Sequence, residues 1–335
     1  MEETVALLVK SILSKGSLQV SSIGFLLIGL FIYWRLPRNR SGRSARGLFR
    51  FLVPAALYGH RSAKIDYWIL PLTIGSAFLV SATGLVAQFL VSNSIQEPLS
   101  GILGVRTAIV ENSRGTVALQ FLIFFLAADL MQYVQHYLFH KIPLLWRLHR
   151  AHHSAEVLTP VTRWRFHPLE TIIEAIITGP GSGILSGFML YVCGMKATGA
   201  AMTLVVATRL ALQVTYYFRH SHVWISYGTV LSHFFYSPCM HQIHHSALQQ
   251  HRDKNLGSLL SVWDYLFGTL YVPRQREEFL LGLSVEEVHD RNPHPDAVAL
   301  LIEPLVTAAR LVTAARTAGK LPGADRSRHP SQNGR

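Results

Sequence analysis

The chain has few charged residues for its length. Charged side chains make up 15% of the 335 residues, whereas a soluble globular domain usually carries about a quarter. Half of the residues are hydrophobic, and they occur in long blocks rather than evenly. The scarcity of charge therefore argues against a soluble domain and favours a membrane protein.

The chain also has little cysteine. Its two cysteines, Cys193 and Cys239, do not form a CxxC pair, which argues against a disulfide scaffold or a thiolate zinc site. The opening MEETVALLVK lacks the basic region of a cleaved signal peptide. No haem-attachment motif, flavin-fold pattern or GxGxxG segment is present.

Positive charge is what the chain does have, with a net charge of +12. Eight basic residues fall between Arg35 and Lys64, directly after an apolar block. This is the usual place of Lys and Arg in cytoplasmic loops of membrane proteins. A nucleic-acid-binding protein would instead gather them on a soluble domain, so no nucleic-acid partner is expected.

Five blocks are long and apolar enough to predict membrane-spanning helices. They cover residues 20–34, 67–91, 116–139, 172–193 and 198–218. Gly179, Pro180 and Gly181 interrupt the fourth, which is therefore predicted to be kinked or re-entrant. With residues 35–64 in the cytoplasm, segments 141–170 and 220–335 should lie there too, and residues 92–115 outside.

The chain contains 17 histidines, and eight of them lie in three tight groups. The segments QHYLFH, LHRAHH and MHQIHH supply His136, His140, His149, His152, His153, His241, His244 and His245. Residues three and four apart share a helix face, and neutral imidazole binds iron, zinc, copper or nickel. One tetrahedral zinc needs four ligands, so eight imidazoles predict two metal ions rather than solvated or structural histidines.

Together with NLGSLLSVWDYLFGTLY (Asn255–Tyr271), these boxes resemble the fatty acid hydroxylase and sterol desaturase superfamily over roughly residues 127–272. The resemblance implies an all-α transmembrane bundle of four to five helices with a cytosolic helical cap. It also implies a non-haem di-iron centre for O₂-dependent hydroxylation or desaturation of lipids. His220 matches the place of a ninth ligand in the family, and His167 and His222 are weaker candidates.

Several other residues are expected to support the centre or the fold around it. Asp129 lies seven residues before His136 on the same helix face, so its carboxylate is expected to orient an imidazole or to pair with an arginine. Glu156 is a weaker candidate for the same supporting role, and Asn255 and Asp264 are expected to fix the cap. His251 is left open, and the remaining histidines are expected at the surface: His60, His233, His289, His294 and His329.

The domain division that follows has three parts. Residues 1–112 form an N-terminal transmembrane region with the basic loop, residues 113–275 the catalytic core, and residues 276–335 a surface helix and a disordered tail. The tail, from residue 317, consists mainly of small and polar residues and contains Pro and Gly, which is typical of disorder.

The leading functional hypothesis is a membrane-bound lipid hydroxylase or sterol desaturase-type oxidoreductase of lipid biosynthesis. No side chain cleaves an unactivated C–H bond, so a metal must carry this chemistry. Electrons from NAD(P)H would then need a separate carrier, a b-type cytochrome or a ferredoxin. The alternatives are an ether-lipid (alkylglycerol) monooxygenase, an acyl-chain desaturase, which HxxxH disfavours, and a metal transporter, whose sites lie near the bilayer midplane.

Overall fold

The structure is a computed structural model that describes residues 16–35, 44–110, 113–288 and 292–317. Helices make up the regular structure of these ranges, with two isolated β-bridges, Phe235 to Leu260 and Ser246 to Leu281. The longer helices are α2 (Gly16–Arg35), α5 (Arg61–Ser94), α7 (Ser113–Lys141), α8 (Pro143–His153), α9 (Pro168–Val192), α10 (Gly199–Arg219) and α15 (Ala297–Thr317). The shorter elements are α3 (Ala45–Leu52), α4 (Ala55–Tyr58), α6 (Gln96–Leu103), η2 (Thr162–Trp164), α11 (Gly228–Leu231), α12 (Pro238–His244), η3 (Gln249–His251), α13 (Val262–Phe267) and α14 (Val285–Val288).

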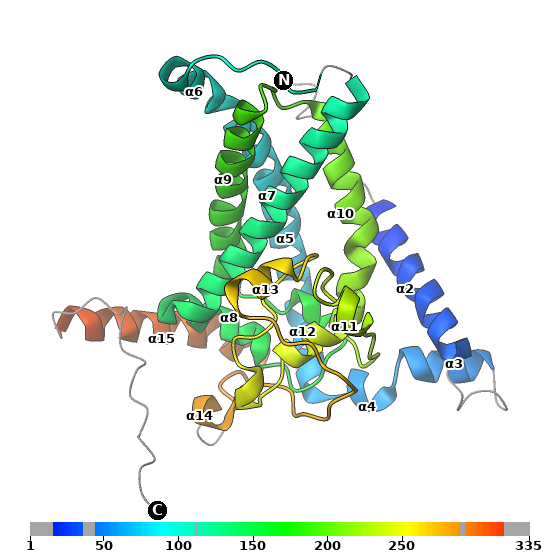
Figure 1. Cartoon of the computed structure of the whole chain (residues 1–335). Coiled ribbons are helices and arrows are strands. Elements are labelled where there is room, and N and C mark those ends of the chain that lie inside the picture. The colour runs from blue at the N-terminus through cyan, green and yellow to red at the C-terminus, as the bar shows by residue number, and fades with distance from the viewer. Residues whose placement is uncertain (1–15, 36–43, 111–112, 289–291, 318–335) are drawn as a thin grey trace, which may run out of the picture.

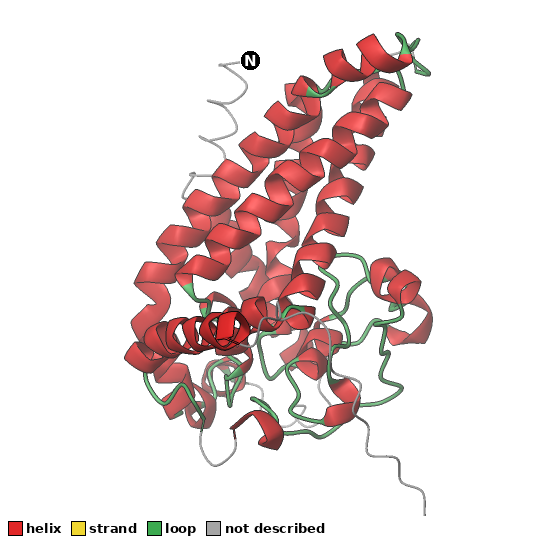
Figure 2. Cartoon of the chain, turned by 90° about the vertical axis from the view of Figure 1, so that its left-hand side faces the viewer, coloured by secondary structure: helices red, strands yellow, loops and turns green. Residues whose placement is uncertain are grey.

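Four long helices, α5, α7, α9 and α10, form a bundle, and α2 packs against α10 (Figure 1). Helix α8 and the short elements α11 to α14 gather with their loops at one end of this bundle (Figure 1), and we call this part the cap. Figure 2 shows the cap loops at that end and the bundle helices running away from it. The predicted all-α bundle with a helical cap is therefore confirmed.

The five predicted spans fall on α2, α5, α7, α9 and α10, and none extends more than one residue beyond its helix. Among the described residues, α7, α9 and α15 are long and apolar enough to cross a membrane by length and composition. The prediction of a re-entrant fourth span is wrong, because α9 continues unbroken through Pro180. Of the predicted disordered tail, Thr317 is the last residue of α15, and residues 318–335 lie outside the described residues.

Helices α5 and α9 pack more extensively than any other pair in the described chain. Small residues spaced by four along α9 allow this approach: a Cβ on Gly179 would lie 2.8 Å from the Gly84 carbonyl oxygen, and one on Gly187 2.7 Å from that of Ser92. Such spacing lets backbones of membrane helices pack closely. The glycines that suggested a break instead form a helix–helix contact.

We expect Gly187→Ala to destabilise the bundle by about 1–3 kcal/mol, the usual cost of forcing extra volume into a packed contact. Gly75→Ala is the matched control, because Gly75 lies in α5 with nothing within 4 Å of its added Cβ. That change should stabilise the helix by about 0.5–1 kcal/mol. Thermal unfolding of the detergent-solubilised protein measures both, and equal melting temperatures would contradict the close contact.

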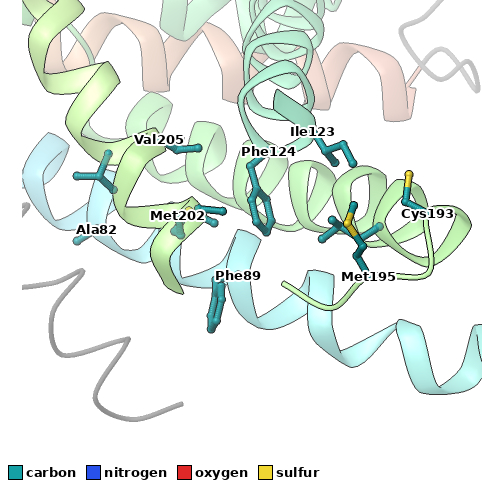
Figure 3. Packing of buried hydrophobic residues seen from close by; sticks show 11 residues of the cluster. Ala82, Phe89, Ile123, Phe124, Cys193, Met195, Met202 and Val205 are labelled. Atoms are coloured by element: carbon teal, nitrogen blue, oxygen red, sulfur yellow. The ribbon is translucent and has the colours of Figure 1, made fainter. Parts of the chain in front are cut away.

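The apolar core of the bundle lies between all four helices (Figure 3). Phe89 of α5, Phe124 of α7 and Met202 of α10 are almost fully buried in it. Buried polar groups add interhelical bonds: the Gln88 amide donates to the Phe124 carbonyl oxygen at 3.1 Å. These contacts join the four helices in the half of the bundle that lies away from the cap.

Candidate metal centre

Nine histidines from four parts of the chain meet at the cap end of the bundle. They form two groups, each with its ligand atoms within 4.8 Å of one another. The five-histidine group contains His136, His140, His149, His153 and His244. The four-histidine group contains His152, His220, His241 and His245. The structure thus brings together the eight motif histidines and His220.

Each HxxHH box supplies two histidines to one group and one to the other, and the two boxes supply their pairs to different groups. In α8, His149 and His153 point to the five-histidine group, and His152 points to the other. At α12, His241 and His245 belong to the four-histidine group, and His244 to the other. The i, i+4 pair of each box shares a face, and the i+3 residue lies to one side of it. The groups are adjacent, since the rings of His153 and His245 stack with centroids 4.7 Å apart.

Most of these imidazoles bond outward through Nδ1 and point inward through Nε2. In the four-histidine group, His152 Nδ1 donates to the Arg165 carbonyl oxygen at 3.3 Å and His220 Nδ1 to that of Tyr216 at 3.3 Å. A carbonyl oxygen only accepts, so both Nε2 atoms carry lone pairs. These two Nε2 atoms nevertheless lie 3.2 Å apart. Facing lone pairs repel at this distance unless a cation lies between them.

The same arrangement recurs in the five-histidine group. His136 Nδ1 donates to the Leu256 carbonyl oxygen at 2.9 Å, and its Nε2 lies 3.1 Å from His149 Nε2. Imidazole nitrogens 2.0–2.1 Å from one metal ion at near-right angles would be about 3 Å apart. The buried Nε2 atoms of His140 and His244 have no hydrogen-bond partner among the described residues. The donor set therefore fits two imidazole-bound metal ions.

Burial keeps the histidines of α8 and α12 neutral. It lowers the pKa of His152, and the nearby imidazoles lower it further; His241 and His245 show the same shift for the same reasons. Burial also lowers the pKa of His220, to about 3. Neutral imidazole is the form that binds metals, so these ligands need no deprotonation near pH 7.

One short segment, residues 253–256, supplies partners to three imidazoles of the five-histidine group. The Asp253 carboxylate accepts from His140 Nδ1 at 3.2 Å, and the Lys254 carbonyl oxygen accepts from His244 Nδ1 at 2.9 Å. Together with the Leu256 carbonyl oxygen, they orient three rings. Asp253 and Asn255 adopt left-handed backbone conformations, with φ of 55° and 57°. Strained backbone of this kind persists where surrounding structure holds it.

The segment is held in turn by the two polar residues predicted to fix the cap. The Asn255 side chain bonds the backbone of Met240 and Tyr271. The Asp264 carboxylate accepts from the backbone N–H of Leu256 at 2.7 Å. These contacts confirm the prediction that Asn255 and Asp264 fix the cap.

Glu170, which no motif pointed to, is the closest carboxylate partner of the centre. Its Oε1 atom lies 2.6 Å from His149 Nδ1, and both side chains are buried. Glu170 lies in the first turn of α9. The carboxylate holds the Nδ1–H tautomer and leaves Nε2 free, as partners of metal-bound histidine commonly do.

The two weaker ligand candidates lie outside both groups. His167 caps α9: its Nδ1 accepts from the Leu169 N–H at 3.2 Å, and its Nε2 donates to the Leu301 carbonyl oxygen at 3.0 Å. His222 Nε2 donates to the Phe51 carbonyl oxygen at 2.8 Å. Both rings make structural contacts to the backbone.

The prediction that Asp129 and Glu156 orient an imidazole is wrong, since neither carboxylate contacts one. Asp129 accepts from the backbone N–H of Leu259 and from Trp263 Nε1, both at 2.9 Å. Seven residues of helix put it about 10 Å from the level of His136, too far to reach that ring. Glu156 accepts from Arg61 at 3.1 Å at the surface.

The structure also places two histidines outside the metal groups, one of them against expectation. His294 was predicted at the surface but is fully buried, with Nε2 3.0 Å from the Glu303 carboxylate. His251 bonds Glu277 at 3.1 Å, away from both groups. His289 and His329 lie outside the described residues.

Arg165 fixes the end of α8, the helix that carries three of the imidazoles. The fully buried guanidinium donates to the Ala151 carbonyl oxygen at 3.0 Å and to Ser154 Oγ at 3.0 Å. It also forms a buried ion pair with Asp66 of α5 at 2.8 Å. Because its own carbonyl oxygen orients His152, Arg165 couples the bundle to the four-histidine group.

We expect Arg165→Met to lower the free energy of unfolding by about 3–5 kcal/mol, because it leaves Asp66 buried without its counter-charge. Arg252→Met is the control, since Arg252 is part-exposed and its ion pairs within the described chain, with Glu286 and Glu287, are long at 3.6 Å. That change should cost less than about 1 kcal/mol. Denaturation in detergent compares the two variants, and similar losses would contradict a special role for the buried pair.

A pocket opens beside the five-histidine group on the cap side. Its wall includes His140, His153 and His244 together with Trp146, and residues 246–249, 252–253, 282–284 and 287 complete it. One group of imidazoles therefore borders a pocket on the cap side.

Comparison with known proteins finds a family model that covers the centre. The model of the fatty acid hydroxylase family matches residues 121–269, which include all nine histidines. The chain is 27% identical to ornithine lipid hydroxylase OlsE of Rhizobium tropici over 168 residues, 50% of this chain and 46% of the relative. It is 26% identical to alkylglycerol monooxygenase of Caenorhabditis elegans over 167 residues, 50% of this chain and 30% of the relative.

A third similar protein is very-long-chain aldehyde decarbonylase GL1-9 of Oryza sativa subsp. japonica. It is 27% identical over 153 residues, 45% of this chain and 54% of the relative. The chain thus spans about a third to a half of the length of the curated relatives it matches. No solved structure matches it.

Proposed function

Because residues 121–269 carry a fatty acid hydroxylase domain, we propose that the chain is a membrane-bound oxidoreductase that hydroxylates or desaturates a lipid with O₂. The observation that carries the proposal is the pair of adjacent imidazole groups whose inward Nε2 atoms require cations. Residues 113–275 would form the catalytic core, and the segments before and after it would support the core in the membrane.

The residues present fit two iron ions, one in each histidine group. When bound, two ferrous ions supply the electrons that activate O₂ for attack on a C–H bond. The chain's own residues orient the ligands, with Glu170, Asp253 and backbone carbonyls fixing Nδ1. Imidazole alone would also accept zinc, so the assignment to iron rests on the family.

The substrate class follows from where the two groups lie. They are at the cap end of α7, next to the membrane-spanning part of the bundle. A lipid chain would enter from the bilayer, and its polar head would stay at the cap. The relatives named for ornithine lipids and alkylglycerols support a polar-headed lipid substrate, and the ether-lipid monooxygenase alternative stays within this class.

Electrons would come from a separate NAD(P)H-linked carrier, a b-type cytochrome or a ferredoxin. Helices α3 and α4, which belong to the basic segment 35–64, lie at the cap end (Figure 1). An acidic carrier would therefore meet positive charge near the metal groups, although the same charge also follows from a cytoplasmic location of the cap. We propose that the cap faces the cytoplasm.

A metal transporter is the alternative from another class. Its binding sites would lie near the bilayer midplane, whereas both histidine groups lie at the cap end of the bundle, on α7's last turns and on cap elements. The position of the groups therefore favours the enzyme.

The proposal is tested on full-length protein loaded anaerobically with ferrous iron in membranes. We expect about two irons per chain, one for each imidazole group, and a change in the lipid profile of host cells that express the chain. Metal analysis and lipid mass spectrometry measure these two results. Zinc in place of iron in active protein, or iron uptake into sealed vesicles without lipid oxidation, would contradict the proposal.

A further inference from the structure

Helix α15 combines the composition of a membrane span with the position of a surface helix. Only 11% of its most apolar stretch is buried, against 39% in α7 and in α9. Unlike those helices, it runs across the end of the bundle, at the level where α7 passes into α8 (Figure 1). The exposed apolar surface of a helix in this position must be buried by something other than the bundle.

The first half of α15 is attached side-on to the cap end of the bundle. Leu300 is fully buried against Ile65 and Ile69 of α5 and Ala151 of α8. The Glu303 carboxylate binds Arg150 of α8 and, at 3.0 Å, His294 Nε2. A helix that crossed the membrane beside the bundle would have to give up these contacts.

The His167 contact places α15 next to the start of a membrane span. His167 caps α9 and donates to the Leu301 carbonyl oxygen of α15 at 3.0 Å. The first turns of α9 expose apolar side chains, including Leu169 and Ile172. The lipid-facing surface of α9 therefore begins beside α15, at the depth where a span enters the membrane.

The outer side of α15 carries a stripe of exposed apolar residues. Val298 is 70% exposed, Ile302 52%, Leu305 40% and Val306 41%. Their spacing of four, three and one residues puts them on one helix face, away from Leu300 and Glu303. Arg310 and Arg316 are exposed further along the helix. An apolar face with basic residues near it is typical of helices that lie in a membrane interface.

We propose that α15 lies in the plane of the membrane, in the headgroup region of the leaflet next to the cap, with its apolar stripe in lipid. Arg310 and Arg316 would then meet lipid phosphates. The helix does not cross the bilayer, so both of its ends stay on the cap side. Through Glu303 and Arg150 it also braces α8, the helix of His149, His152 and His153, against the membrane surface.

Sidedness is tested with single cysteines in the full-length protein, since both native cysteines are buried. Thr317→Cys marks the end of α15, Glu286→Cys the cap, and Val105→Cys the opposite end of the bundle. The Glu286 side chain is 72% exposed, and the residue Val105 is 87% exposed. A membrane-impermeant maleimide is applied to spheroplasts and to inverted vesicles. We expect Thr317→Cys to react in the same preparation as Glu286→Cys. Reaction together with Val105→Cys would overturn the proposal.

Depth is tested with spin labels at Ile302→Cys and Leu305→Cys in phosphatidylglycerol-containing vesicles. We expect collisions with O₂ to exceed collisions with a water-soluble nickel chelate at both positions, and the reverse at the Glu286→Cys control. Nickel-dominated collisions would show that the stripe faces water. Low access to both reagents with spin–spin broadening would show that a second copy covers it, and either result would overturn the proposal.

Discussion

His152→Ala and His244→Ala should each lower lipid oxidation by more than about 100-fold, the upper end of the loss expected when only an outer partner of a metal ligand is removed. His152 belongs to the four-histidine group and His244 to the five-histidine group, so each variant removes a ligand from one ion. Neither residue lies in the membrane-spanning part of the bundle, so both variants should still be inserted in the membrane.

Metal analysis of the same variants separates the two groups. Each variant should lose the iron of its own group first, so the content should fall from about two irons per chain toward one. His222→Ala and His233→Ala are controls, because His222 bonds a backbone oxygen and His233 is exposed. Activity retained in both ligand variants would contradict the proposed function, whereas equal loss in the controls would indicate misfolding.

The spacing of the histidine boxes predicted two metal ions, and the structure gathers the histidines into two groups, but the spacing did not predict how each box is divided between the groups. An i, i+4 pair on one helix face was visible in the sequence, and it holds for His149 with His153 and for His241 with His245. That the i+3 residue crosses to the other group depends on how α8 and α12 face each other. This is a tertiary arrangement, and no local pattern specifies it.

The groups that accept hydrogen bonds from the imidazole Nδ1 atoms could not be predicted from the sequence either. Several are backbone carbonyls, as for His136, His152 and His244, and any residue type supplies a carbonyl. Asp253 and Glu170 are far from their histidines along the chain, so no spacing links them. Asp129 was chosen by helix periodicity, which gives a shared face but not a shared depth.

The bundle was more predictable than the site because a membrane span needs only length and apolarity. The exception was α9, where Gly179, Pro180 and Gly181 suggested a break. Within a membrane, glycine also allows close helix packing. The contact with α5 shows that these glycines pack against a neighbouring helix and do not break α9. His294 shows that tertiary contacts also decide where a polar residue lies, since its burial depends on the Glu303 side chain of α15.

Glu170→Ala should weaken iron binding by about 10–100-fold, the usual cost of losing the partner that orients a metal-bound histidine. The Glu170 carboxylate lies 2.6 Å from His149 Nδ1, and His149 Nε2 lies close to the Nε2 atoms of both His136 and His153. A misplaced His149 ring would therefore disturb the middle of the five-histidine group. Competition with a ferrous chelator measures the change in affinity.

Glu170→Gln separates charge from orientation at the same position. Glutamine keeps an oxygen that accepts from His149 Nδ1 but removes the negative charge, so its loss of affinity should be smaller than that of alanine. Glu277→Gln is the matched control, since Glu277 pairs with His251 at 3.1 Å outside both groups. We expect that control to leave iron binding unchanged. Wild-type affinity in Glu170→Ala would show that the ring of His149 is held by its packing alone.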